Sequence, residues 1–347
     1  MQTYKNRIED TSLQLINYAR VALYTVESFP ILAIKKLLKA NAPMDPMPPE
    51  NHQKLLKQTL DGLIEQDIVN VRQGLYPREL LYPEKPQKHI CRYKELLIDA
   101  LKATLRQKNK KHKEFSEHTE PLLKDMPEYY KRNFHYQTDG YLSSKSAELY
   151  SHQTEILFKG TIALMRRVLM AELIRHIQAR KTPVRILEIG GGAGEATEIL
   201  LKSCPNIEVV FVEPSKPYME FAKNKLSEFN NIEYVNDFFE NYQSRKKFDV
   251  VFSSFLFHEL PLEVRRTVFS KSSKLLKKNA ISFHIDSLQL NDNQEFNWAL
   301  IQFPKDFHEP FYANYIKTPL EELISNDLSF NSNQQAFLSK SVMALNL

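Results

Sequence analysis

Half of the glycines in this 347-residue chain lie in one short segment. They are Gly190, Gly191, Gly192 and Gly194. An apolar run, Val184–Ile189, precedes them with Glu188 near its end, and a helical pattern follows. Glycines permit positive φ and leave room for a ligand against the backbone, while the helix N-terminus offers free N–H groups. A buried strand, a glycine loop and a helix start together predict a nucleotide-binding turn.

Polar or acidic residues also follow the next three apolar runs. Glu213 and Pro214 follow Val209–Val212, Asp237 and Phe238 follow 232–235, and Ser253 lies near the end of 248–254. A carboxylate placed like Glu213 can accept hydrogen bonds from the two hydroxyls of a ribose. These residues are therefore expected to converge at one edge of a sheet.

The spacing E-x-G-x-G-x-G from Glu188 to Gly194 resembles motif I of the class I S-adenosylmethionine (SAM)-dependent methyltransferases. The resemblance implies an α/β, Rossmann-like sheet with helices on both faces, SAM as cofactor, and an enzyme. It also implies that Glu213 binds the ribose, that Asp237 meets the adenine amino group and that Phe238 packs on the ring. The cofactor-binding residues expected are Glu188, Gly190, Gly191, Gly192, Gly194, Glu213, Pro214, Asp237, Phe238 and Ser253. A Rossmann-type domain for another nucleotide is the alternative.

His258 and Glu259 stand side by side after the fourth predicted strand, and we expect them to be catalytic. A neighbouring acid raises the pKa of a histidine, and such a pair can deprotonate a phenol, an enol or an activated carbon. The structural alternative is that His258 packs at the edge of the cofactor while Glu259 is exposed. A base is needed only if the acceptor carries a proton at the working pH.

Two aromatic-rich segments, 129–150 and 303–315, are candidates for an acceptor pocket. The first is interpreted either as a lid over the active site or as core between two domains. The substrate-binding residues expected are His135, Tyr141, His308 and Tyr312. The second segment carries another His–Glu pair, His308 and Glu309, but no zinc-helix spacing such as H-E-x-x-H occurs, so no metal is predicted.

Residues from about 130 onward resemble the quinone-biosynthesis-like branch of class I, which implies O- or C-methylation of a small aromatic or quinone-like acceptor. One alternative is a protein or nucleic-acid methyltransferase that docks through a basic N-terminal domain. Another is a SAM-binding scaffold without catalysis. The sequence does not identify the acceptor, the methylated atom or the oligomeric state.

Three regions are predicted: a helical domain over 1–120, linking helices with the aromatic segment over 121–180, and the SAM-binding domain over 181–347. The first region resembles a winged-helix unit weakly, with a strand and turn over Asp67–Pro77, and would serve as a cap or a homodimer contact. We expect helices over Ile8–Leu23, Phe29–Leu38, Gln53–Ile64, Leu96–Leu105 and Gln153–Ile174. The strands expected are Val184–Ile189, Glu208–Val212, Ile232–Val235, Phe248–Ser253, Ala280–Asp286 and a closing strand within Ala336–Leu347.

The net charge of +5 is a mild excess and does not by itself indicate nucleic-acid binding. The basic run Arg106–Lys113 is interpreted mainly as a solvated helix end, because no aromatic residues interleave with its charges. No apolar run approaches 18 residues, so no membrane span is expected. Two cysteines far apart in sequence, Cys91 and Cys204, are consistent with a reducing compartment, and a cytoplasmic protein is expected.

Overall fold

A computed structural model describes the backbone of residues 2–347 and the side chains from residue 10 onward. Its centre is a seven-stranded sheet in the order β3-β2-β1-β4-β5-β7-β6. The strands are β1 (Val184–Ile189), β2 (Ile207–Val212), β3 (Ile232–Val235), β4 (Phe248–Ser254), β5 (Leu276–Ser287), β6 (Leu328–Ala336) and β7 (Ser339–Asn346). Strands β1 to β5 are parallel, whereas β7 runs antiparallel to both β5 and β6. The predicted Rossmann-like methyltransferase fold is confirmed.

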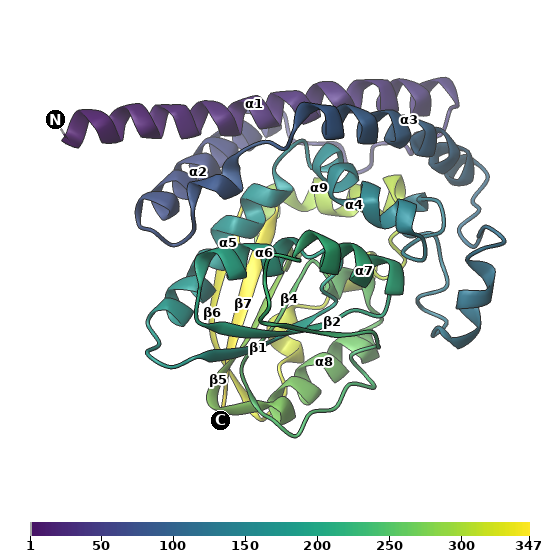
Figure 1. Cartoon of the computed structure of the whole chain (residues 1–347). Coiled ribbons are helices and arrows are strands. Elements are labelled where there is room, and N and C mark those ends of the chain that lie inside the picture. The colour runs from purple at the N-terminus through teal and green to yellow at the C-terminus, as the bar shows by residue number, and fades with distance from the viewer. Residues whose placement is uncertain (1) are drawn as a thin grey trace.

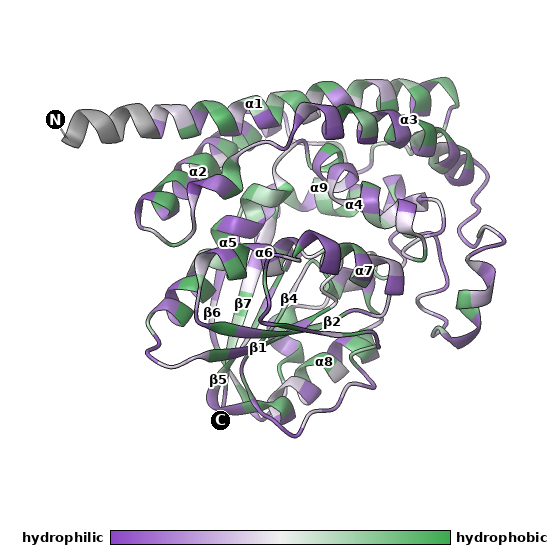
Figure 2. Ribbon diagram, viewed as in Figure 1, coloured by the Kyte–Doolittle hydropathy of each residue, from purple (hydrophilic) through white to green (hydrophobic). Residues whose placement is uncertain are grey.

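Helices cover both faces of the sheet (Figure 1). Alternate strand residues point to opposite faces, so Ile186 packs beneath one group of helices while Leu187 packs with the other. One face carries α5 (Ile162–Gln178), α6 (Glu195–Ser203) and α7 (Lys216–Lys225), and the other carries α8 (Leu262–Leu275). The central strands β1, β2 and β4 are mainly apolar and buried, as expected for strands covered on both faces, whereas the edge strand β6 is polar and largely exposed (Figure 2).

The N-terminal region is helical and forms a separate layer above the sheet (Figure 1). It contains α1 (Gln2–Leu37), α2 (His52–Arg72) and α3 (Pro86–Lys108). The two helices predicted over Ile8–Leu23 and Phe29–Leu38 are one continuous helix, α1, which contains Pro30. The strand predicted over Asp67–Pro77 is wrong, because α2 continues to Arg72 and a turn with Gly74 at φ +72° follows. Since residues 2–183 contain no strand, the winged-helix interpretation has no β-wing.

The long helix predicted over Gln153–Ile174 is instead two helices, α4 (Ser144–Leu157) and α5. Gly160, at φ +81°, breaks the chain between them. A Cβ on Gly160 would lie 3.0 Å from the backbone of Arg20 in α1, so only glycine fits this close approach of two segments. The break lets α4 pack on α1 and α3 while α5 packs on the sheet.

The predicted strands agree with the structure to within a few residues at their ends. The largest difference is β5, which begins at Leu276 rather than Ala280. Asn279 adopts φ +60° there, a left-handed conformation that asparagine adopts more readily than most other residues. The alternation of strands and helices predicted a parallel sheet, and the antiparallel hairpin of β6 and β7 departs from that pattern. The predicted boundaries of the three regions, at residues 120 and 180, stay a prediction.

Within the described residues, no helix combines the length and the hydropathy that crossing a membrane requires.

A buried ion pair joins the helical layer to the sheet. Arg167 of α5 donates from Nε and Nη2 to the two carboxylate oxygens of Asp67 in α2, at 2.9 and 2.8 Å. Asn17 of α1 and the hydroxyl of Tyr76 donate to the same carboxylate. Both charged side chains are at most 2% exposed. Because a buried charge that loses its partner is costly, this contact is a strong constraint on how the two layers fit together.

We expect Asp67→Ala to lower the free energy of unfolding by about 3–5 kcal/mol, because the Arg167 charge stays buried without a partner. Arg266→Ala, which removes an exposed ion pair with Glu263, should cost less than about 1 kcal/mol. Urea unfolding followed by circular dichroism measures both changes. The double variant Asp67→Leu/Arg167→Met should recover most of the loss; equal losses in Asp67→Ala and Arg266→Ala would contradict the assignment.

Candidate functional site

The glycine loop after β1 is fixed by backbone geometry and close packing. Gly190, Gly192 and Gly194 have φ of +63°, +57° and +81°, which side chains other than glycine rarely adopt. Gly191 has no such φ, but a Cβ there would lie 2.2 Å from the ring of Phe211 on β2. The loop therefore lies tightly on the sheet and leads directly into α6.

Glu213, at the carboxyl end of β2, reaches back to this loop. Its Oε2 accepts a hydrogen bond from the N–H of Gly192 at 2.8 Å, and its Oε1 accepts one from the N–H of Ser215 at 2.7 Å. Burial raises the pKa of Glu213 to about 7, although these N–H donors act in the opposite direction. An ionised carboxylate has about four acceptor positions, so capacity remains for two hydroxyls.

A cavity of about 100 Å³ lies where the carboxyl ends of β1, β2 and β4 meet. Seven of the ten residues predicted to bind the cofactor line it: Glu188, Gly190, Gly191, Gly192, Glu213, Pro214 and Phe238. Glu188 is buried, accepts a hydrogen bond from the hydroxyl of Thr197, and has a pKa raised well above its usual range by burial. The structure thus brings the glycine loop, the strand-end carboxylate and an aromatic ring to one space.

Three predicted cofactor residues lie outside this lining. Gly194 caps α6, where a Cβ would meet Ala222 and Leu226 of the α7 segment. Asp237 holds its own loop, since its Oδ1 accepts from the N–H of Phe238 and from Asn241. Ser253 is fully buried and its Oγ lies 2.9 Å from Nδ1 of His284, so it points into the core. Its neighbour Ser254 lines the cavity instead, because successive strand residues face opposite sides.

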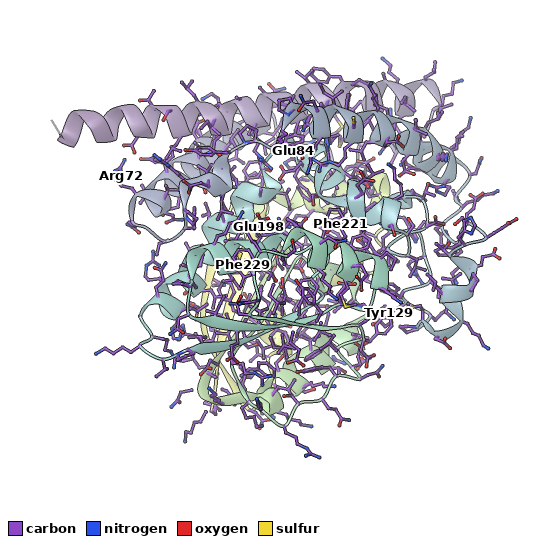
Figure 3. The ribbon with its side chains drawn as sticks, viewed as in Figure 1. Arg72, Glu84, Tyr129, Glu198, Phe221 and Phe229 are labelled. Atoms are coloured by element: carbon purple, nitrogen blue, oxygen red, sulfur yellow. The ribbon has the colours of Figure 1, made fainter. Side chains whose placement is uncertain are left out.

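The aromatic segment 129–150 covers this cavity. Its lining rings are Tyr129, Tyr130, Phe134, Tyr141 and Tyr150. Figure 3 marks Tyr129, whose hydroxyl donates to Glu240 at 2.7 Å across the cavity rim. The rings of Phe134 and Tyr141 also pack on Tyr218 of α7 as a small core. The segment therefore both lines the cavity and packs against α7, and its role as a lid stays a prediction.

A second, larger cavity of about 450 Å³ adjoins the first. Four residues line both: Tyr150, Arg166, Phe255 and Glu259. Its walls come from α1 and α2 on one side and from α9 (Asn297–Asp306) on another. Most of its lining is apolar, including Leu56, Leu60, Phe158, Trp298, Phe303 and Phe337. Polar groups gather at the end that faces the first cavity.

His258 and Asp286 form a buried dyad at this polar end. Nδ1 of His258 lies 2.6 Å from Oδ1 of Asp286, whose Oδ2 accepts the backbone N–H of Phe257. Burial alone would lower the pKa of His258, but Asp286 and then Glu259 raise it to about 9. Nε2 of His258 lies 3.9 Å from Glu259, and both side chains line the larger cavity. A histidine held by a carboxylate at Nδ1 presents Nε2 for proton transfer.

His135 continues this row of charges on the other side of Glu259. Its Nε2 lies 3.6 Å from Glu259 Oε1 and its Nδ1 lies 2.9 Å from Glu309 Oε1, although the latter contact lacks hydrogen-bond geometry. Burial opposes protonation of His135, but Glu309 and Glu259 raise its pKa to about 10. The hydroxyl of Tyr141 donates to Glu259. Acids and imidazoles therefore alternate from Asp286 to Glu309.

The two remaining residues predicted to bind substrate, Tyr312 and His308, lie in different places. Tyr312 lines the larger cavity and its hydroxyl lies 2.6 Å from Oγ of Ser287. His308 lines neither cavity; its ring stacks on His112 with centroids 4.5 Å apart. The glutamates of the two adjacent His–Glu pairs in the sequence, Glu259 and Glu309, both lie beside His135. His258, from the first pair, instead pairs with Asp286. His135, Glu259 and Glu309 could also hold a cation, as their ligand atoms lie within 4.8 Å of one another.

Residues 187–282 match the protein-family profile described as a methyltransferase domain. This span covers the glycine loop, Glu213 and the dyad residue His258. The chain carries a SAM-dependent methyltransferase domain. The residues around the first cavity fit SAM, because the glycine loop is open to a ligand and Glu213 keeps free acceptor positions beside it.

Curated relatives match only part of this chain. Malonyl-[acyl-carrier protein] O-methyltransferase 1 of Ilyobacter polytropus is 32% identical over 89 residues, which are 26% of this chain and 33% of that protein. An uncharacterized methyltransferase of Anoxybacillus flavithermus is 30% identical over 120 residues, 35% of this chain and 55% of that protein. The chain thus spans about a third to about half of these relatives. The quinone-biosynthesis-like branch is not confirmed by them.

Solved structures show similarity over about half of this chain. The N-methyltransferase NodS from Bradyrhizobium japonicum is 13% identical, with a TM-score of 0.39 over 52% of this chain and 96% of that one. Magnesium protoporphyrin IX methyltransferase from Synechocystis is 14% identical, with a TM-score of 0.41 over 55% of this chain and 87% of that one. Such low scores carry no argument about the acceptor.

Three residues at the junction of the cavities were not singled out for the site from the sequence. Arg166 of α5 donates from Nε to Ser254 at 3.2 Å, and its guanidinium lies 5.2 Å from the ring centre of Phe255. Phe255 has φ +56°, a strained conformation that turns its ring between the cavities. Tyr150 comes from α4. The sequence held one signal, the unexplained Arg166–Arg167 pair on an apolar helix.

Lowering the pH from 8 to 6 should weaken binding of S-adenosylhomocysteine roughly tenfold, because Glu213 takes up a proton near pH 7 and a neutral acid accepts fewer hydroxyl hydrogen bonds. Isothermal titration calorimetry measures this change. Glu213→Gln should bind at least tenfold more weakly at pH 8 and show little further loss at pH 6. Glu220→Gln, on the exposed side of α7, is the control and should match wild type. A flat pH profile in wild type would contradict the role of Glu213.

Proposed function

We propose that this protein transfers a methyl group from SAM to a small, largely apolar acceptor held in the larger cavity. The observation that carries the proposal is the contact between the cavities, which share Tyr150, Arg166, Phe255 and Glu259. A volume of about 450 Å³ is typical of small-molecule sites, and its aromatic lining suits an aromatic or quinone-like acceptor. SAM supplies an electrophilic methyl group when bound.

The chain's own residues would position the acceptor and move its proton. The apolar walls exclude water, which favours a methyl transfer that needs alignment more than acid or base strength. We assign His258 as the base, with Nε2 taking the proton and Asp286 holding Nδ1. Glu259 already lines the junction of the cavities, so a neutral hydroxyl, phenol or enol fits this end better than the carboxylate of a malonyl group.

The position of the N-terminal helices favours a small-molecule acceptor over a protein or a nucleic acid. Val21 of α1 and Leu56 and Leu60 of α2 form part of the cavity wall, so these helices enclose the site. Arg106, in the basic run, is 7% exposed and donates to the carbonyl of Tyr136 and the hydroxyl of Thr138. At least one charge of this run is thus engaged internally. Docking of a macromolecule remains the alternative.

The homodimer expected through the N-terminal region stays a prediction. The outer face of α1 exposes Leu15, Leu23, Val26, Phe29 and Leu37, which is consistent with it.

The acceptor is tested with methyl-labelled SAM and a panel of phenols, quinols and malonyl thioesters. We expect transfer to a neutral phenol or quinol, and a loss of at least about a hundredfold in His258→Gln with SAM affinity kept within threefold. His118→Gln, an exposed histidine outside both cavities, is the matched control. Transfer to malonyl thioesters alone would move the acceptor to the class named for the relatives. SAM binding without any transfer would favour a scaffold.

The His258–Asp286 dyad predicts how kcat/KM depends on pH. Because carboxylates raise the pKa of His258 to about 9, kcat/KM should rise with pH from 7 to about 9 as the imidazole loses its proton. In Asp286→Asn the main carboxylate is gone, so the midpoint should fall by at least one pH unit and the maximal rate should also fall. Rates with the best phenolic acceptor at constant ionic strength measure both. An unchanged midpoint in the variant would show that another group titrates.

A further inference from the structure

Three metal-ligating side chains meet in the helical layer, away from both cavities. They are Glu27 of α1, His89 of α3 and His152 of α4. Nε2 of His89 lies 2.7 Å from Glu27 Oε1, and Nε2 of His152 lies 2.9 Å from Glu27 Oε2. Neither imidazole lines either cavity, and neither does Glu27. Two imidazoles from separate helices thus present the same ring nitrogen to one carboxylate.

The spacing of these atoms suits one small cation. One ligand atom from each residue lies within 4.8 Å of the others, and the two N–O distances are below 3 Å. A tetrahedral ion with bonds of about 2.0–2.1 Å needs its ligands about 3.3 Å apart, so each of the two nitrogen–oxygen distances must lengthen by only a few tenths of an ångström. The two rings are already close, with centroids 4.3 Å apart.

The surroundings are built in the way that metal sites are. Nδ1 of His89 faces Glu84 at 3.3 Å, which matches the carboxylate that commonly orients a ligating histidine. Arg92 donates to the same Glu84 and holds it in place. Figure 3 marks Glu84 among the N-terminal helices, far from the sheet. Tyr24 packs against both imidazoles, which limits access of water.

His152 is the most deeply buried imidazole of the cluster, with 1% exposure. Its Nε2 faces Glu27, and its Nδ1 is buried without a hydrogen-bond partner, so no second polar group holds the ring in another orientation.

We propose that Glu27, His89 and His152 bind one Zn²⁺, with water as the fourth ligand. Two imidazoles and a carboxylate favour Zn²⁺ over Mg²⁺ or Ca²⁺, which prefer oxygen ligands. The ion joins α1, α3 and α4, which also pack on one another through a small apolar cluster. Its role is to fix the helical layer, and the site does not depend on the proposed methyl transfer.

The test is titration of Zn²⁺ into metal-stripped, full-length protein by calorimetry, with Mg²⁺ as a parallel titrant. We expect one Zn²⁺ per chain, no comparable binding of Mg²⁺, and a loss of at least a hundredfold in affinity in His89→Gln and in His152→Gln. Glu84→Gln should weaken binding about 10–100-fold through the orientation of His89. His135→Gln removes the imidazole of the other His–Glu cluster and should change zinc affinity less than threefold.

The absence of saturable Zn²⁺ binding to wild type would overturn the proposal. So would unchanged affinity in folded His152→Gln, or a loss confined to His135→Gln. Circular dichroism checks the fold of each variant. If His89→Gln or His152→Gln fails to fold, X-ray absorption of the wild-type zinc complex decides: two imidazoles in the coordination shell support the site, and one or none overturns it.

Discussion

The buried pairing of Arg167 with Asp67 determines how the helical layer sits on the sheet. Both side chains are almost fully excluded from water, so neither can move without leaving an unpaired charge in the interior. Asn17 and Tyr76 complete the hydrogen bonds of the carboxylate. The contact fixes α1 and α2 relative to α5, and those helices supply one wall of the larger cavity. The shape of the proposed acceptor site therefore depends on an interaction outside it.

The sheet imposes the second constraint. Parallel strands end at the same edge, so β1, β2 and β4 bring the glycine loop, Glu213 and the loop before His258 into one place. The N-terminal half completes the site from above through Tyr141 and Tyr150. The cavity built by the sheet, which we propose for SAM, thus meets the larger cavity, which is built largely by helices and which we propose for the acceptor. Their contact surface is where the chemistry of the proposed reaction belongs.

A row of buried charged side chains distinguishes the junction of the two cavities from an ordinary hydrophobic core. Asp286, His258, Glu259, His135 and Glu309 alternate in sign when both imidazoles are protonated, and the carboxylates raise both histidine pKa values. The row leaves an excess of one negative charge before Arg166 is counted. Such a buried network is costly unless its members are paired, which explains why each imidazole has a carboxylate neighbour on either side. A neutral acceptor group keeps that balance.

The sequence by itself determined the catalytic fold and most of the cofactor cavity. Strands such as Val184–Ile189 and motifs such as the glycine loop are local patterns, and the rule that parallel strands end together carries Glu213 and Phe238 to the same place. Ser253 faces the core rather than the cavity, because a shift of one residue reverses the face of a strand. The continuous α1 through Pro30 was missed because packing overrode local propensity. The break at Gly160 agrees with the low helix propensity of glycine and was missed because the apolar pattern continues on both sides of it.

Only the tertiary structure decided which distant groups meet. His258 pairs with Asp286 rather than acting with Glu259 alone, Glu309 reaches His135 while its neighbour His308 turns away, and the cluster of Glu27 draws on three helices. No fixed spacing in the sequence predicts these contacts, because they depend on how the layers pack against one another and not on the periodicity of a single helix or strand. The sequence set what each segment forms, and long-range packing, with its buried charges, set what the segments enclose.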